Sequence, residues 1–87
     1  MEIGLVVGSV VSTQKESSLV GCKFLIVKNV DSDGNSSGKE RVAIDVLGAG
    51  KGELVLLSSG SAARTFLDNP KTPIDLAVVG IIDSVEK

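Results

Sequence analysis

The stretch Val42–Arg64, VAIDVLGAGKGELVLLSSGSAAR, contains two apolar runs joined by a glycine-rich loop and followed by a turn of small residues. Val42–Leu47 has the alternating, β-branched pattern of a strand, and Glu53–Leu57 is typical of a second strand. The loop Gly48–Gly52 holds three glycines in five residues, which permit a positive φ or the close approach of another chain. This stretch therefore predicts two strands that are connected by a tight loop.

The rest of the chain adds three strands and one short helix to this pair. The expected strands are Glu2–Thr13, Lys23–Val30, Val42–Leu47, Glu53–Leu57 and Ile74–Ile82. Gly8 marks a bend in the first strand, and Asp31–Lys39 predicts a solvated hairpin tip. A helix over Ser61–Leu67 has to stop before Pro70. Five short strands and one late helix predict an all-β fold, a small Greek-key barrel that forms one domain over residues 1–87.

The composition favours association with other copies of the chain. A domain of 87 residues buries only a small core, and such domains often need disulfides, metals or partner subunits. Cys22 is the only cysteine and there is no histidine, which excludes an internal disulfide and the usual Cys/His metal sites. We expect Cys22 to pack in the interior, and a lone cysteine indicates a reducing, cytoplasmic setting. Self-association is the remaining route to stability.

Nucleic acid and membrane are poor partner classes for this chain. Nine basic residues face eleven acidic ones, so no phosphate-binding surface is expected. Phe24 and Phe66 are the only aromatic residues, whereas binding of single strands needs aromatic platforms. The N-terminal segment MEIGLVVGSVVSTQKE has no basic region like that of a signal peptide, and no apolar run is long enough to span a bilayer.

Motifs of enzymes and metal sites fail at defined positions. Gly48–Glu53 fits neither the P-loop nor the G-x-G-x-x-G pattern. Two S-x-x-K matches, at Ser12–Lys15 and Ser36–Lys39, lack companion motifs and a histidine base. Asp31–Val42 begins like a calcium loop but lacks the glycine at position six and the glutamate at position twelve. We therefore predict no catalytic residues, no metal site and no cofactor.

Charged residues near the glycine loop allow two interpretations. The sequence brings together no pair of carboxylates for acid–base chemistry among Asp45, Glu53, Asp75 and Asp83. Lys51 is expected to be solvated. Arg64 follows small residues at the start of the expected helix, where it is either solvated or makes a bidentate contact to a carboxylate or backbone carbonyls. Our hypothesis is that Glu53 and Arg64 are contact residues.

The same stretch resembles the EutN/CcmL family of pentameric vertex proteins of bacterial microcompartment shells. Two signature blocks of that family match here at Gly48, Ala49, Gly50, Gly52 and Glu53, and at Gly60, Ser61, Ala63 and Arg64. Ala62 departs from the family's usual second serine, and Phe24 stands where leucine is usual. The segments GSVVSTQK, LVGCKFLIV and PIDLAVVGIID resemble further blocks, so the resemblance covers nearly the whole chain in order.

The resemblance implies an OB-like barrel and a structural role with no enzyme activity. It implies a homopentamer at the five-fold vertices of a microcompartment shell in the cytoplasm, in contact with hexameric shell proteins and with a small central pore. The residues expected at subunit or pentamer–hexamer contacts are Gly48, Ala49, Gly50, Gly52, Glu53, Gly60, Ser61, Ala63 and Arg64. The alternative is an OB-fold module that binds nucleic acid or another ligand. The type of microcompartment stays open among ethanolamine, propanediol, glycyl-radical and carboxysome types.

Overall fold

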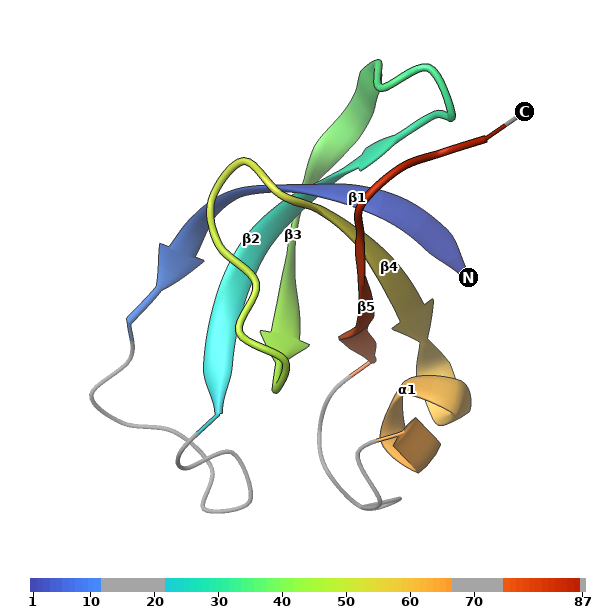
Figure 1. Ribbon diagram of the computed structural model, residues 1–87. Helices are drawn as coiled ribbons and strands as arrows, with labels where there is room; N and C mark the ends of the chain where they lie inside the picture. The colour runs from blue at the N-terminus through green and yellow to red at the C-terminus, as the bar shows by residue number, and fades with distance from the viewer. Residues whose placement is uncertain (12–21, 67–74, 87) are drawn as a thin grey trace.

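The protein folds into a closed barrel of five strands with one short helix (Figure 1). The computed structural model describes residues 1–11, 22–66 and 75–86. Its elements are β1 (Glu2–Val10), β2 (Lys23–Val30), β3 (Ser36–Asp45), β4 (Leu54–Ser59), α1 (Gly60–Phe66) and β5 (Leu76–Ile82). The strands close in the order β1-β2-β3-β5-β4, where β3 and β5 run parallel and the other neighbours run antiparallel. The predicted all-β barrel, with its helix between the last two strands, is confirmed.

The five strands and the helix lie where the sequence predicts them, but several of their ends differ, and β3 is the main correction. β2 covers the expected Lys23–Val30, whereas β3 begins at Ser36 rather than at Val42. The polar residues 36–39 therefore belong to a strand instead of a hairpin tip, because they pair with the end of β2, with Asn29 opposite Ser37. The turn between Val30 and Ser36 is therefore short. It is stabilised by the Asp31 carboxylate, which accepts the backbone N–H groups of Asp33 and Asn35.

The other differences lie at element ends. β3 ends at Asp45 instead of Leu47, β4 runs over Leu54–Ser59 instead of Glu53–Leu57, and α1 begins at Gly60 instead of Ser61. β1 ends at Val10 instead of Thr13, and β5 begins at Leu76 instead of Ile74. The expected helix end at Leu67 lies outside the described residues. Gly8 follows a register shift between Val6 and Gly8 in the pairing of β1 with β2, which confirms the expected bend in this strand.

The core is the inside of the barrel, which small and medium aliphatic residues fill. The buried cluster consists of Val6, Leu25, Val27, Ala43, Ala49, Val55, Leu57, Leu76 and Val78. Gly4 belongs to the same inner layer, because a Cβ at this position would lie 2.6 Å from Leu57 Cδ1. An inner volume this small and this tightly filled leaves little apolar surface to stabilise the protomer by itself.

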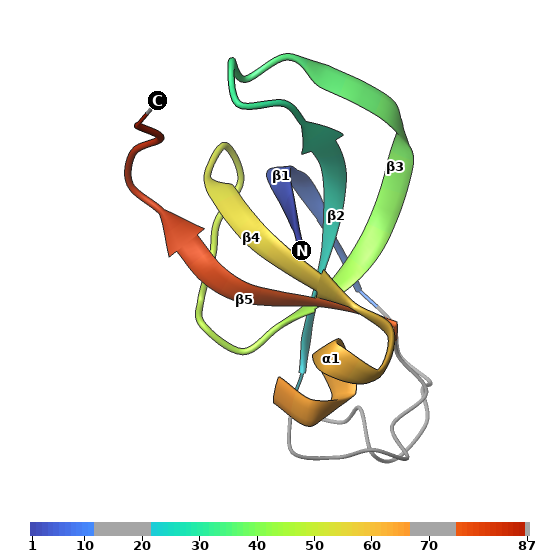
Figure 2. The same cartoon turned by 90° about the vertical axis from the view of Figure 1, so that its right-hand side faces the viewer.

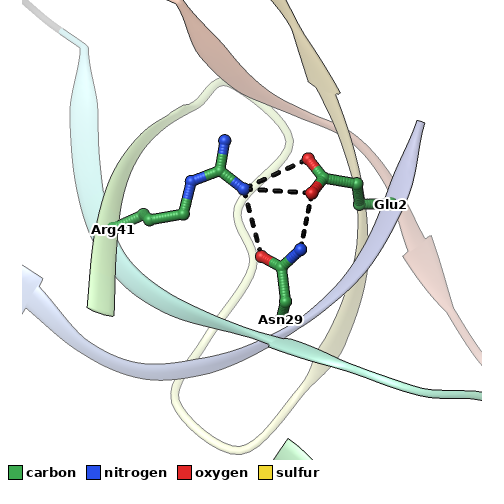
Figure 3. A network of polar contacts seen from close by, with 3 residues as sticks. All are labelled: Glu2, Asn29 and Arg41. Atoms are coloured by element: carbon green, nitrogen blue, oxygen red, sulfur yellow. Dashed lines mark hydrogen bonds and ion pairs between the residues drawn. The ribbon is translucent and has the colours of Figure 1, made fainter. Parts of the chain in front are cut away.

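A polar network closes one end of the barrel (Figure 3). Arg41 Nη1 donates to both carboxylate oxygens of Glu2 and to Asn29 Oδ1, each at 3.1 Å. Asn29 Nδ2 donates to Glu2 Oε1 at 2.5 Å. All three side chains share the inward register of the core, since Glu2 pairs with Leu57, Asn29 with Gly4, and Arg41 with Val27. Inward polar residues at this end therefore satisfy one another where the apolar core stops.

In the part of the chain that the structure describes, no helix has the length and apolar character needed to cross a membrane.

Candidate functional site

The glycine loop is held by the buried carboxylate of Asp45, the last residue of β3. Asp45 is only 3% exposed, and its oxygens accept the backbone N–H groups of Leu47 at 2.9 Å, Gly48 at 3.2 Å and Ala49 at 2.7 Å. A carboxylate that accepts several backbone amides makes strong, charge-assisted bonds and fixes the chain around it. Asp45 is therefore committed to the loop, which explains why it is not part of an acid–base pair.

The loop then returns along the barrel from the end of β3 to the start of β4 (Figure 1). Lys23 Nζ donates to the carbonyl of Ala49 at 3.0 Å, and the Ala49 side chain is fully buried in the core. The backbone of Val6 pairs with the far side of the loop, through Gly52 N to Val6 O at 2.8 Å and Val6 N to Glu53 O at 3.0 Å. These contacts attach the loop to β1 and β2.

Glycine is required in this loop where the backbone turns. Gly48 and Gly52 have φ angles of 91° and 90°, a region that other residues enter only with strain. Glu53 closes the turn, because its carboxylate accepts the N–H of Gly50 at 2.6 Å and its own N–H donates to the Gly50 carbonyl at 3.1 Å. Lys51 is exposed at the tip of this turn, as expected.

The second signature block forms α1. Gly60 starts the helix with a φ of 62° and donates its N–H to the carbonyl of Asp75 at 2.9 Å, which ties α1 to the start of β5. Ala63 is fully buried against the barrel, Ser61 is exposed, and Arg64 is half-buried. The small residues of this block therefore allow the helix to lie close to β4 and β5.

The two blocks form two surfaces and not one. Glu53 precedes β4 and Arg64 follows it in α1, so a strand of six residues, about 20 Å long at the usual rise, separates their backbones. Of the nine expected contact residues, Ala49 and Ala63 point into the protomer, so their side chains act by packing. The contact role of the other seven stays a prediction.

Sequence reasoning missed two polar arrangements and overestimated the burial of one residue. The network of Glu2, Asn29 and Arg41 joins three strands, and its members carry no recognisable motif. The role of Asp45 was also missed, although its position just before a glycine loop is typical of a residue that bonds nearby backbone amides. Cys22 is half-buried, whereas we expected it in the interior.

The arrangement offers little for metal or acid–base chemistry. Among residues 1–11, 22–66 and 75–86, no three His, Cys, Asp or Glu side chains gather in a way that fits a metal ion. Asp31, the first residue of the sequence that resembles a calcium loop, uses a carboxylate oxygen for the backbone of its own turn. What the described residues present instead is a rigid barrel with apolar side chains on its outer walls.

Comparison with known proteins identifies what this barrel is similar to. Residues 1–83 match the family model described as "Ethanolamine utilisation protein EutN/carboxysome". The chain is 53% identical to the bacterial microcompartment shell vertex protein PduN of Salmonella typhimurium, over 98% of both chains. It is 51% identical to the carboxysome shell vertex protein CcmL of Gloeobacter violaceus, over 98% of this chain and 85% of that one.

Solved structures agree with the sequence comparisons. A structure described as the ethanolamine utilization protein EutN superposes with a TM-score of 0.96 at 44% identity, over 100% of this chain and 91% of that one. The GrpN pentameric microcompartment shell protein from Rhodospirillum rubrum superposes with a TM-score of 0.90 at 45% identity, over 100% and 99% of the two chains. The five-stranded barrel, the two signature blocks and these matches over nearly the whole chain show that the chain belongs to the EutN/CcmL family.

Proposed function

We propose that this protein is a structural subunit of a bacterial microcompartment shell and forms a homopentamer at the five-fold vertices. The observation that carries this proposal is the match over the whole chain to a solved pentameric shell protein, at 45% identity and a TM-score of 0.90. Relatives at 53% and 51% identity are described as shell vertex proteins. None of these descriptions names an enzyme activity, and the structural role requires none.

The role follows from the geometry of shells. Hexameric tiles alone build a flat sheet, and closing such a sheet into a polyhedron requires five-fold units at its corners. A ring of five subunits then has a side that meets the next subunit and an edge that meets the surrounding tiles. We infer that the loop Gly48–Glu53 and the start of α1 supply part of these contacts, since both are held by hydrogen bonds to the rest of the chain and both carry the family's signature residues.

An OB-fold module that binds nucleic acid is the competing function, and the described surface does not favour it. Such modules need a basic groove with exposed aromatic side chains. The chain has a net charge of −2, and of its two phenylalanines Phe24 is half-buried on β2. A shell role uses the features that are present, and nucleic-acid binding needs features that the described residues lack.

Native mass spectrometry of the purified protein tests the proposal. We expect a dominant species at five times the subunit mass of 8.9 kDa. A monomer, or a ring with another number of subunits, would overturn the vertex assignment. Co-expression with hexameric shell proteins gives the second readout, because closed shells are expected only when the pentamer is present.

The contact role of Arg64 has its own test within the same assay. Arg64→Ala removes a cation that can donate bidentate hydrogen bonds, and we expect shells to close poorly while the pentamer mass is unchanged. Lys39→Ala is the matched control, because it removes an exposed cation from the projecting part of β3. If Arg64→Ala shells close as well as Lys39→Ala shells, Arg64 does not contact the tiles.

A further inference from the structure

The proposed pentamer requires each subunit to present two different surfaces to its neighbours. In a closed ring every interface is heterologous, so one patch of a subunit meets another patch of the next subunit. A stable interface covers about 800 Å² on each partner, so two interfaces cover a sizeable share of the 5339 Å² that the isolated protomer exposes.

The first such surface, here called the β4 wall, consists of large apolar side chains on the outer face of β1, β4 and β5. Its members are Ile3, Leu5, Leu54, Leu56 and Ile82. They are neighbours in register, since Ile3 pairs with Leu56, and Leu54 pairs with both Leu5 and Ile82. Each keeps part of its surface exposed, so the described residues form a continuous apolar patch here that the protomer covers only in part.

The second surface, the β3 wall, lies on the outer face of β1, β2 and β3. The register places Val10, Phe24, Ile26, Val42 and Ile44 on this face, with Gly8 opposite Ile26. Ile44 is only 2% exposed, so the protomer itself covers this end of the wall. Val42 is 52% exposed and Val10 is 37% exposed. β1 contributes to both walls because its bulge at Gly8 turns the strand from one side of the barrel to the other. In Figure 2, β3 and β5 diverge from the end of the barrel where they pair.

Gly8 supports the view that the β3 wall is covered by another chain. Its φ is not positive, and a Cβ there would lie 3.7 Å from Ile26 Cδ1, an ordinary contact. Neither the backbone nor the packing of the protomer therefore demands glycine on this outer face. A glycine in a strand often marks a place where another backbone approaches closely, and here it leaves a notch beside exposed apolar side chains.

From these observations, we propose that the β4 wall of each subunit packs against the β3 wall of the next subunit around the ring. This inference rests on the proposed pentamer and specifies which faces build it. The strands themselves support it, since segments such as Leu54–Leu57 and Phe24–Val27 are apolar on both faces. Strands that are covered on both sides have this pattern, whereas strands with one face in water alternate.

One lysine in each wall provides the test. We expect Val42→Lys and Leu56→Lys each to change the species in native mass spectrometry from pentamer to monomer, because each blocks one of the two faces. Both side chains point outward, so the variants are expected to keep the circular dichroism spectrum of the wild-type barrel. Val85→Lys is the matched control: Val85 is 40% exposed, lies beyond β5 and belongs to neither wall, so this variant is expected to remain a pentamer.

Mixing the two blocked variants tests the pairing itself. A Val42→Lys subunit keeps its β4 wall, and a Leu56→Lys subunit keeps its β3 wall, so an equal mixture is expected to form a heterodimer that neither variant forms alone. Gly8→Leu is a second, uncharged variant, which fills the notch and is expected to weaken the pentamer while the barrel stays folded.

The outcomes separate this inference from the proposed function. A wild-type protein that is not a pentamer refutes the proposed function. A wild-type pentamer whose Val42→Lys and Leu56→Lys variants remain pentamers refutes only the assignment of the walls. The assignment of the walls is also refuted if the blocked variants form pentamers but fail to build shells with hexameric tiles, because the walls then face the tiles. Folded monomers that do not combine in the mixture refute the pairing of one wall with the other.

Discussion

Replacement of Asp45 by alanine is the sharpest test of how the glycine loop is held. Its carboxylate accepts three backbone N–H groups, and that of Ala49, at 2.7 Å, belongs to a fully buried residue. A buried donor left without an acceptor costs about 1–3 kcal/mol. Leu47 and Gly48 are exposed, so their backbone N–H groups can form hydrogen bonds to water instead. We therefore expect Asp45→Ala to lower the free energy of unfolding by about 1–3 kcal/mol.

This loss is large against the about 5–15 kcal/mol that stabilises a typical small protein. Urea unfolding followed by circular dichroism measures it, with all variants at one subunit concentration because association adds to the apparent stability. Asp45→Asn keeps one acceptor oxygen and the side-chain volume, so its effect should lie between those of wild type and Asp45→Ala.

Asp31→Ala is the matched control. Asp31 also accepts two backbone N–H groups, of Asp33 and Asn35, at 2.9 and 3.0 Å, but all of these residues are exposed. Water replaces the lost acceptor there, so the expected cost is at most about 1 kcal/mol. If Asp45→Ala is no more destabilising than Asp31→Ala, then the carboxylate does not hold the loop, and the backbone pairing of Val6 with Gly52 has to be sufficient.

Three further predictions concern the barrel. The hydrogen bond from Asn29, and after it the one from Arg41, lowers the pKa of Glu2 below its ordinary value of about 4.5. The ionised Glu2 therefore stabilises the fold above about pH 4.5, and this stabilisation is lost as the pH falls through the lowered pKa. Unfolding curves between neutral pH and the acid range should therefore show a weaker acid dependence for Glu2→Gln; an equal dependence contradicts this. Gly4→Ala should lower the free energy of unfolding by about 1–3 kcal/mol, because the new Cβ would lie 2.6 Å from Leu57 Cδ1. Urea unfolding measures this loss, and an unchanged midpoint would show that Leu57 can move aside. Gly52→Ala should cost about 1–2 kcal/mol through its φ of 90°, and a smaller loss in thermal unfolding would mean that the turn changes conformation.

The sequence predicted strands well where apolar residues determine the pairing. β2 was predicted with its observed ends because Phe24–Val27 is an apolar run and the turn residues that begin at Asp31 follow Val30. The beginning of β3 was not, because Ser36–Lys39 is polar and becomes a strand only by pairing with β2. Propensity describes how a residue suits a half-buried surface, and an exposed strand that extends beyond the barrel gives no such signal.

The candidate site was predictable only as two sequence blocks. Their glycines and small residues are local features, and the positive φ angles of Gly48 and Gly60 agree with that reading. The network of Glu2, Asn29 and Arg41 depends on register between strands that are 27 and 39 residues apart in sequence. A shift of register by one residue would turn these side chains outward, so the network can be derived only after the pairing is known.

The apolar residues outside the core connect the composition with assembly. Hydrophobic residues make up 43% of the chain, but the inside of the barrel takes only a small group of them. Other apolar residues of the described part lie on the outer strand faces and in the loop after β3, with Val42 at 52% and Val46 at 53% exposure. Exposing such side chains to water costs about 25 cal/mol for each Å² of apolar surface, and covering them with a neighbour recovers that free energy. A protomer of this kind gains stability when it joins a ring, because part of its apolar surface lies on its outside and is covered there by a neighbour.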